Sequence, residues 1–256
     1  MRIRLLPSSA GRDSQLQCLT SFLIDNRVAV DGGSLGFALV PEEIGTIRDI
    51  VITHSHADHT ASLPIYVAEA FSALTDPIVI YGSDEVIAAL RKHVFNDHVW
   101  PDFGKIPLPT GKGPTVEFKE LRAGEKIKIA DLEVTPILVN HLVPTFGLMV
   151  EGDGVAVIFT SDTYCTDEIW QVAKANKSLR AVFVDVSFPN EMGQLAEVSK
   201  HLTPVLLAEE LKKLDRDVEV YAVHIKPTHR DQVINELAEL SDPQVRVGEI
   251  GHVYEW

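Results

Sequence analysis

Four apolar, strand-like runs in this chain each lead directly into histidine or aspartate. The run Ile47–Ile52 precedes the segment Thr53-His54-Ser55-His56-Ala57-Asp58-His59-Thr60. Single candidates follow three later runs: His141 after Val134–Val139, Asp162 after Val155–Phe159, and His224 after Val218–Val223. Loops at strand ends commonly carry functional groups. The pattern therefore predicts a sheet-based fold in which these side chains converge at one sheet edge.

The spacing within the first segment suits metal binding. His54 and His56 alternate along an extended backbone, so their side chains point the same way and both can bind one ion. Asp58 and His59 follow the bend and are placed for a second ion. Neutral imidazole and carboxylate suit zinc, and also iron or manganese. The alternative is an exposed polar turn, but with 10 histidines in 256 residues this triple spacing is rarely met by chance.

Taken one at a time, the three later candidates are weak. A lone histidine at a strand end is more often structural or exposed. Asp162 would also serve as the cap of a helix near Thr166. Only in combination with the first segment do His141, Asp162 and His224 favour a shared metal site.

The remaining pattern predicts an α/β chain. Further strands are expected at residues 1–6, 19–24, 27–31, 78–81, 116–119, 126–130, 146–151 and 181–186. Helices are expected at 64–74, 83–95, 166–175, 203–214 and 230–240. Residues 96–114 hold four prolines and three glycines, which predicts an irregular insertion. No linker divides the chain, so we expect a single domain over residues 1–256.

Strands clustered in each half, with helices between them, predict an αββα sandwich. In that architecture two packed mixed β-sheets carry helices on their outer faces. Periodicity alone also permits an ordinary three-layer α/β fold.

Charge and composition narrow the range of partners. The formal net charge is −14, from 23 basic and 37 acidic residues, which argues against extended nucleic-acid binding. An anionic substrate would need local cations or bound metal ions to attract it. The chain has two cysteines, and the sequence shows neither a signal peptide nor an apolar stretch of about 18 residues. We therefore expect a cytoplasmic protein without a membrane partner.

The segment His54-Ser55-His56-Ala57-Asp58-His59 resembles the H-x-H-x-D-H signature of the metallo-β-lactamase superfamily. Other segments resemble the class II cyclic-nucleotide phosphodiesterases: Val30-Asp31-Gly32-Gly33-Ser34, Val99-Trp100-Pro101-Asp102-Phe103, Ser187-Phe188-Pro189-Asn190, His201-Leu202-Thr203-Pro204 and His224-Ile225-Lys226-Pro227. Two positions depart from that family. Ala57 stands where the family usually has leucine, and Lys200 stands where it usually has glycine.

The resemblance implies a metallo-β-lactamase fold with two divalent metal ions, zinc being favoured over manganese or iron. His54, His56 and His141 would hold the first ion. Asp58, His59 and His224 would hold the second, and Asp162 would bridge the two. The implied substrate is a small phosphodiester, specifically a 3′,5′-cyclic nucleotide of the cyclic AMP or GMP type. A homodimer is a further expectation.

The resemblance also implies a mechanism with a metal-bridging hydroxide as nucleophile, which Asp58 would help to orient. His201 is the candidate general acid for the leaving sugar oxygen, with Asp185 as its partner. The alternatives are that His201 only lies near a helix start at Thr203-Pro204, and that Asp185 only ends a strand.

Three further residues are candidates for substrate contact. Trp100 and Phe103 would stack on a nucleobase, or instead anchor the insertion. Lys226 would reach a phosphate, or instead face solvent. Rival functions are a ribonuclease Z-like phosphodiesterase and a hydrolase of lactones, thioesters or sulfate esters. A non-catalytic metal-binding sensor is the most distant alternative, because such a protein would typically have lost a ligand or the acid.

Overall fold

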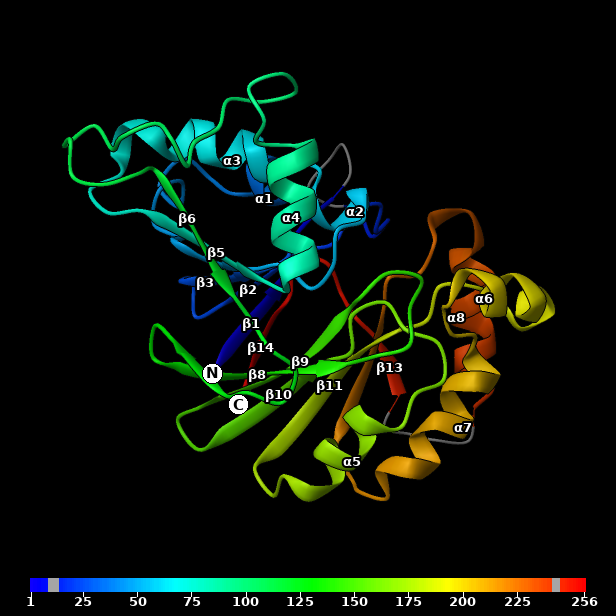
Figure 1. Cartoon of the computed structure of the whole chain (residues 1–256). Coiled ribbons are helices and arrows are strands. Elements are labelled where there is room, and N and C mark those ends of the chain that lie inside the picture. Colours follow the sequence, from blue (N-terminus) through cyan, green and yellow to red (C-terminus); the bar gives the residue numbers. More distant parts are fainter. Residues whose placement is uncertain (9–13, 241–244) are drawn as a thin grey trace. The chain divides into compact units, whose positions relative to one another are not determined.

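The computed structural model describes residues 1–8, 14–240 and 245–256. The chain forms two compact units (Figure 1). The N-terminal unit comprises residues 1–14, 19–122 and 251–255, and the C-terminal unit comprises residues 15–18, 123–250 and 256. Each unit contains one seven-stranded mixed sheet. The expectation of a single domain stays a prediction.

The sheet of the N-terminal unit has the order β14-β1-β2-β3-β4-β5-β6. Its strands are β1 (Arg2–Leu5), β2 (Phe22–Ile24), β3 (Val28–Val30), β4 (Asp49–Val51), β5 (Ile78–Gly82), β6 (Val116–Glu120) and β14 (Val253–Glu255). The pairs from β14 to β3 are antiparallel, and those from β3 to β6 are parallel. The helical elements are α1 (Leu35–Ala38), α2 (Ala57–Thr60), α3 (Leu63–Ala70), the 3₁₀ turn η1 (Phe71–Ala73) and α4 (Asp84–His93).

The core of this unit lies between one face of its sheet and helices α1, α3 and α4. Pro64 lies in the first turn of α3, and Ser83 caps α4 by accepting a hydrogen bond from the Val86 amide. Tyr66 and Leu90 from these helices are buried together with Ile50 of β4 and Ile80 of β5. Alternate strand residues face the helices, as the two-residue period of a strand requires.

The sheet of the C-terminal unit has the order β13-β12-β11-β10-β9-β8-β7. Its strands are β7 (Ile127–Ile129), β8 (Leu132–Leu138), β9 (Phe146–Gly152), β10 (Val155–Phe159), β11 (Leu179–Asp185), β12 (Glu219–Val223) and β13 (Val245–Val247). Strands β7 to β10 pair antiparallel, and β10 to β13 pair parallel. The helical elements are α5 (Glu168–Ala175), η2 (Asn190–Met192), α6 (Gly193–Ser199), α7 (Pro204–Leu214), η3 (Pro227–His229) and α8 (Arg230–Ala238).

The core of the C-terminal unit lies between its sheet and helices α5, α7 and α8. Trp170 of α5, Leu207 of α7 and Val233 of α8 are buried with Val184 of β11 and Val220 of β12. Helix α7 begins as its sequence predicts, because the Thr203 hydroxyl accepts from the Leu206 amide and Pro204 occupies the first turn.

The expected strands and helices are all present, with ends that differ by a few residues. The structure adds α1, α2, α6, β13 and β14, which the sequence pattern did not predict. Residues 96–114 contain no named helix or strand, as expected for the insertion. Among the described residues, no helix is both long enough and apolar enough to span a membrane.

Candidate metal centre

The N-terminal unit places three histidines together where β4 leads into α2. His56 keeps an extended backbone, with φ −63° and ψ 150°, and the helix starts at the next residue. The ring centroid of His54 lies 4.7 Å from that of His56 and 4.1 Å from that of His59. Asp58 lies in the first turn of α2, directly before His59. The segment thus brings its histidines together as its spacing predicts.

A buried aspartate orients this segment. Oδ2 of Asp31 lies 2.7 Å from Nδ1 of His59, and Oδ1 accepts a 2.8 Å hydrogen bond from the Thr53 amide. The Thr53 hydroxyl lies 3.1 Å from Nδ1 of His54. Both imidazoles are therefore engaged through Nδ1, which directs Nε2 to the metal in a histidine site. The sequence pattern indicates no role for Asp31, although its place after a strand and before Gly32-Gly33 is a usable signal.

The backbone of α2 is fixed to the loop that follows β3 and to the segment before β2. The Gly32 amide donates to the His59 carbonyl at 2.7 Å, and the Thr20 amide donates to the Asp58 carbonyl at 2.8 Å. At Gly33 a Cβ atom would overlap the Asp58 carbonyl oxygen, so only glycine fits this approach. The positions of Asp58 and His59 therefore depend on a close backbone contact as well as on their own side chains.

In the C-terminal unit, Asp162 lies between two of the predicted ligands. Its Oδ2 is 3.9 Å from Nε2 of His141, and its Oδ1 is 3.5 Å from Nε2 of His224. The three residues follow β8, β10 and β12, as the apolar runs predict. One carboxylate that offers a different oxygen to each imidazole has the arrangement of a bridging ligand.

Both of these histidines are also engaged through Nδ1. Nδ1 of His141 lies 3.0 Å from the carbonyl oxygen of Lys200, so it donates to that oxygen. Nδ1 of His224 lies 3.0 Å from the hydroxyl of Ser187. As in the N-terminal unit, Nε2 is the atom directed toward a metal. The sequence pattern indicates no role for Ser187 or for the Lys200 carbonyl.

His201 and Asp185 form a buried pair in the same unit. Nδ1 of His201 lies 2.8 Å from Oδ2 of Asp185, while the Ser187 hydroxyl donates to Oδ1 at 2.7 Å. Burial raises the pKa of the Asp185 carboxyl, but attraction to His201 and hydrogen bonds from His201 and His224 outweigh it and bring the pKa to about 2. Asp185 is therefore a carboxylate at neutral pH and holds the His201 ring in place.

The donor sets of both units fit divalent metal ions. In the C-terminal unit, ligand atoms of Asp162, Asp185, His201 and His224 all lie within 4.8 Å of one another. Imidazole and carboxylate are the ligands that zinc, iron and manganese accept. Four of the predicted histidine ligands are oriented by a hydrogen bond at Nδ1, which is the outer support that metal-binding histidines normally have.

Four of the ten described non-glycine residues with positive φ angles lie at the candidate centre. Asp31, Ser161, Lys200 and His224 have positive φ angles between 56° and 63°, which L-residues other than asparagine and aspartate seldom adopt. Each such residue costs about 1–2 kcal/mol and persists only where its surroundings impose it. These four positions lie in, or next to, the candidate ligands and their supports.

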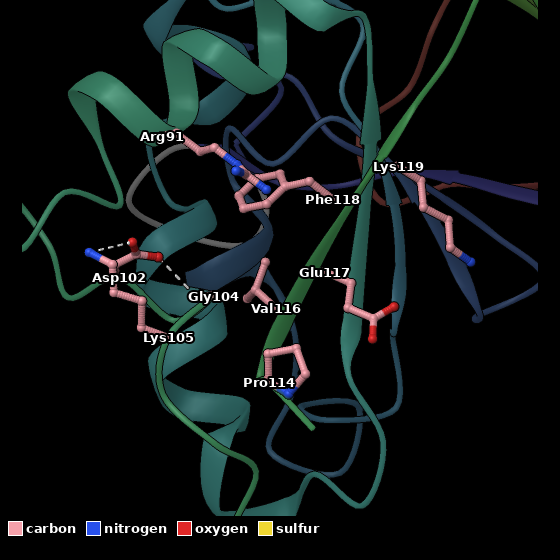
Figure 2. A pocket seen from close by; sticks show the side chains of 9 residues that line it. All are labelled: Arg91, Asp102, Gly104, Lys105, Pro114, Val116, Glu117, Phe118 and Lys119. Carbon is pink, nitrogen blue, oxygen red and sulfur yellow. Dashed lines mark hydrogen bonds and ion pairs between the residues drawn. The ribbon is translucent and has the colours of Figure 1, made fainter. Parts of the chain in front are cut away.

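The three predicted substrate contacts have different surroundings. Phe103 is buried in the core of the N-terminal unit, and Trp100 packs against that core. This placement favours the anchoring alternative for both rings. Neither ring lines the nearby hollow of about 560 Å³ beside β6, and no candidate ligand lines it (Figure 2). The Lys226 amide donates to the Ser187 carbonyl at 3.2 Å, so its backbone adjoins the candidate site.

Comparisons with known sequences agree on one family. The family model for class II cAMP phosphodiesterases matches residues 42–236. A probable 3′,5′-cyclic-nucleotide phosphodiesterase of Yersinia pestis is 24% identical over 77% of this chain and 64% of its own length. The 3′,5′-cyclic-nucleotide phosphodiesterase 1 of Saccharomyces cerevisiae is 27% identical over 76% of this chain and 61% of its own length. The chain thus spans less than two thirds of these relatives.

Solved structures agree on the fold. Unliganded yeast PDE1 matches with a TM-score of 0.78 over 98% of both chains, at 18% identity. The metallo-β-lactamase fold protein YhfI from Bacillus subtilis matches with a TM-score of 0.76 over 99% of both chains, at 14% identity. The predicted α/β metallo-β-lactamase fold is therefore confirmed, and the ordinary three-layer alternative is wrong.

Proposed function

Because the chain belongs to the class II cAMP phosphodiesterases, we propose that it is a metal-dependent phosphodiesterase that hydrolyses a cyclic nucleotide of the 3′,5′-cyclic AMP or GMP type. The observation that carries the proposal is the family match over residues 42–236 in a chain whose strand ends present the predicted metal ligands. The net charge of −14 also favours a small substrate over a nucleic-acid polymer.

We assign two divalent metal ions to seven ligands, with zinc favoured over manganese or iron. His54, His56 and His141 would hold one ion, Asp58, His59 and His224 would hold the other, and Asp162 would be shared. The chemistry that two bound ions supply is activation of a water for attack on phosphorus and stabilisation of charge on the phosphoryl oxygens. Support comes from the Nδ1 contacts of His54, His59, His141 and His224, which direct Nε2 toward the metal.

The protein's own acid in this proposal is His201. The sugar oxygen is a poor leaving group and needs a proton as the bond to phosphorus breaks. In the imidazolium form of His201, Nδ1 donates to Asp185 and Nε2 carries the proton that the leaving oxygen receives. Asp58 has the second role of orienting the attacking water. The Asp185 carboxylate, which is ionised at neutral pH, keeps the imidazole in the required orientation.

A turnover panel tests this function. Protein loaded separately with zinc, manganese and iron is assayed with cyclic AMP, cyclic GMP, 2′,3′-cyclic AMP, bis(p-nitrophenyl) phosphate, a lactone, a thioester, a sulfate ester and precursor tRNA. We expect turnover of a 3′,5′-cyclic nucleotide, and loss of that turnover after chelation with recovery on reloading. Specific cleavage of precursor tRNA without cyclic-nucleotide turnover would establish the ribonuclease alternative. Activity confined to the lactone, thioester or sulfate ester would exclude a phosphodiesterase.

A further inference from the structure

Lys200 has a backbone conformation that glycine adopts more easily. It caps the C-terminus of α6 with φ 59° and ψ 54°, and the next amide, of His201, donates to the Ala196 carbonyl at 2.9 Å. Such a helix end normally carries glycine because a Cβ atom is unfavourable there. Glycine would supply the same carbonyl to His141, so neither the turn nor that hydrogen bond explains why the residue is lysine.

The lysine side chain lies on an aromatic ring. Nζ of Lys200 is 5.1 Å from the centroid of Tyr164, within the range of a cation–π contact. No carboxylate pairs with this ammonium among the residues that the structure describes, whereas Lys174 pairs with Asp215 and Lys212 pairs with Glu209 in the same unit. In a chain of net charge −14, Lys200 is therefore a cation held by a neutral partner.

This cation is next to the candidate metal ligands. Its own carbonyl binds Nδ1 of His141, and Tyr164 follows Asp162 by two residues. The Tyr164 amide donates to the carbonyl of Asn140, the residue before His141, at 2.8 Å. One main-chain hydrogen bond and the bond from Nδ1 of His141 to the Lys200 carbonyl thus join the segments that carry Lys200, Tyr164 and His141. The backbone of Lys200 and the ring that its ammonium contacts therefore both lie on segments that carry candidate ligands.

We propose that Lys200 is a substrate-binding residue whose ammonium contacts the phosphoryl oxygens of an anionic phosphodiester, with the Tyr164 ring as its support. The inference rests on the proposed phosphodiesterase function and assigns a specificity-determining residue to it. Lys200 adds positive charge where an acidic protein must attract an anion. Tyr164 is a positioning residue, because it restricts the flexible lysine chain before the substrate binds.

The experiment compares zinc-loaded wild-type protein with Lys200→Gln and Lys200→Arg, using cyclic AMP and bis(p-nitrophenyl) phosphate. We expect Lys200→Gln to raise KM about 5- to 10-fold for both substrates, because one charged hydrogen bond in a partly exposed site is lost. We expect kcat to change less than about twofold, because the contact already exists in the ground state. Lys200→Arg should restore KM. Lys128→Gln, the same charge change on the exposed part of β7, should leave KM unaltered.

The Lys200→Gly variant distinguishes the contribution of the lysine side chain from that of the backbone. Glycine keeps the left-handed turn and the carbonyl that binds His141, so metal content should stay at the wild-type level while KM rises as in Lys200→Gln. Wild-type KM in both Lys200→Gln and Lys200→Gly would overturn the proposal. Loss of metal together with kcat in Lys200→Gln would also overturn it, because the residue would then act through His141.

Binding of inorganic phosphate, measured by titration calorimetry on the zinc-loaded proteins, tests Lys200 independently of turnover. Lys200→Gln should weaken phosphate binding about 5- to 10-fold. If the wild-type protein hydrolyses no phosphodiester, the proposed function is wrong. The role of Lys200 would then be tested by phosphate binding alone. Equal phosphate affinity in wild type and Lys200→Gln would overturn the proposal for Lys200.

Discussion

Nδ1 of His59 lies 2.7 Å from Oδ2 of Asp31, and both side chains are almost completely buried. The same carboxylate accepts hydrogen bonds from the amide and the hydroxyl of Thr53. One side chain therefore fixes the orientation of His59 and, through Thr53, of His54. Asp31 does not belong to the proposed ligand set, but it orients two residues of that set.

Replacement of Asp31 by alanine should weaken metal binding by about 10- to 100-fold, because an outer support of a metal-binding histidine is lost. Competition with a chromophoric chelator measures the affinity, and circular dichroism verifies that the variant is folded. Asp76→Ala is the control, because Asp76 is an exposed partner of Arg48. A folded Asp31→Ala protein with wild-type affinity would contradict the orienting role.

His56→Ala should lower the metal content of the purified protein and abolish turnover together. We expect about two ions per chain in the wild type, counted by elemental analysis. His98→Ala removes an exposed histidine of the insertion and should change neither quantity. Full activity of His56→Ala with unchanged metal content would show that His56 is not a ligand.

His201→Ala should separate binding from chemistry. We expect a loss in kcat of roughly 10²–10⁴-fold on cyclic nucleotides with little change in KM, because general acid catalysis acts in the transition state. The defect should be much smaller on bis(p-nitrophenyl) phosphate, since p-nitrophenolate leaves without a proton. Metal content should be unchanged, and His252→Ala serves as the exposed control. Equal losses on both substrates would indicate a positioning role instead.

The Asp185 carboxyl predicts a pH dependence of stability. Its pKa falls from 3.8 to about 2 on folding, so the charged form stabilises the folded state by about 2 kcal/mol at neutral pH. This contribution is complete above about pH 5 and is lost as the pH falls through about 2. Denaturant unfolding of metal-free wild type and Asp185→Asn should therefore give free energies that converge on acidification. If the difference in unfolding free energy between the two proteins stayed constant from about pH 6 to 2.5, this prediction would be wrong.

Glu210→Ala should destabilise the C-terminal unit. Glu210 is 2% exposed and accepts hydrogen bonds from Nε1 of Trp170 at 2.8 Å and from the Thr166 amide at 3.0 Å. Its removal leaves buried donors without an acceptor, which costs about 2–4 kcal/mol. Glu209→Ala, at an exposed position paired with Lys212, should cost less than about 0.5 kcal/mol. Equal unfolding free energies for the two variants would contradict the prediction.

Much of the candidate metal centre could be proposed from the sequence because the candidate ligands have positions that the sequence displays. His141, Asp162 and His224 follow apolar runs, and the spacing of His54, His56 and His59 is visible along the chain. Asp31, Ser187 and the Lys200 carbonyl were assigned no role. They act on a histidine that is distant in the sequence, so no local spacing identifies them.

The elements that were not predicted lack a strong local pattern. Strands β13 and β14 have three residues each and alternate with charged side chains such as Arg246 and Glu255. They are strands because a neighbouring strand offers hydrogen bonds, which no local sequence window contains. Phe103 is a residue whose role the local sequence leaves open. An aromatic ring in the insertion could stack on a nucleobase or pack in the core, and only the tertiary contacts show that it packs in the core.

The pairing of β14 with β1 has a consequence for the order of synthesis. Ile3 pairs with Tyr254, while all seven strands of the C-terminal unit lie consecutively between residues 127 and 247. On the ribosome, β1 is therefore made before its partner β14, and all strands of the second sheet are made between them. Until β14 is made, β1 is an open edge that other nascent chains can pair with, and Arg2 and Arg4 supply the charges that discourage it. The N-terminal unit thus completes its sheet only after every strand of the C-terminal unit has been made.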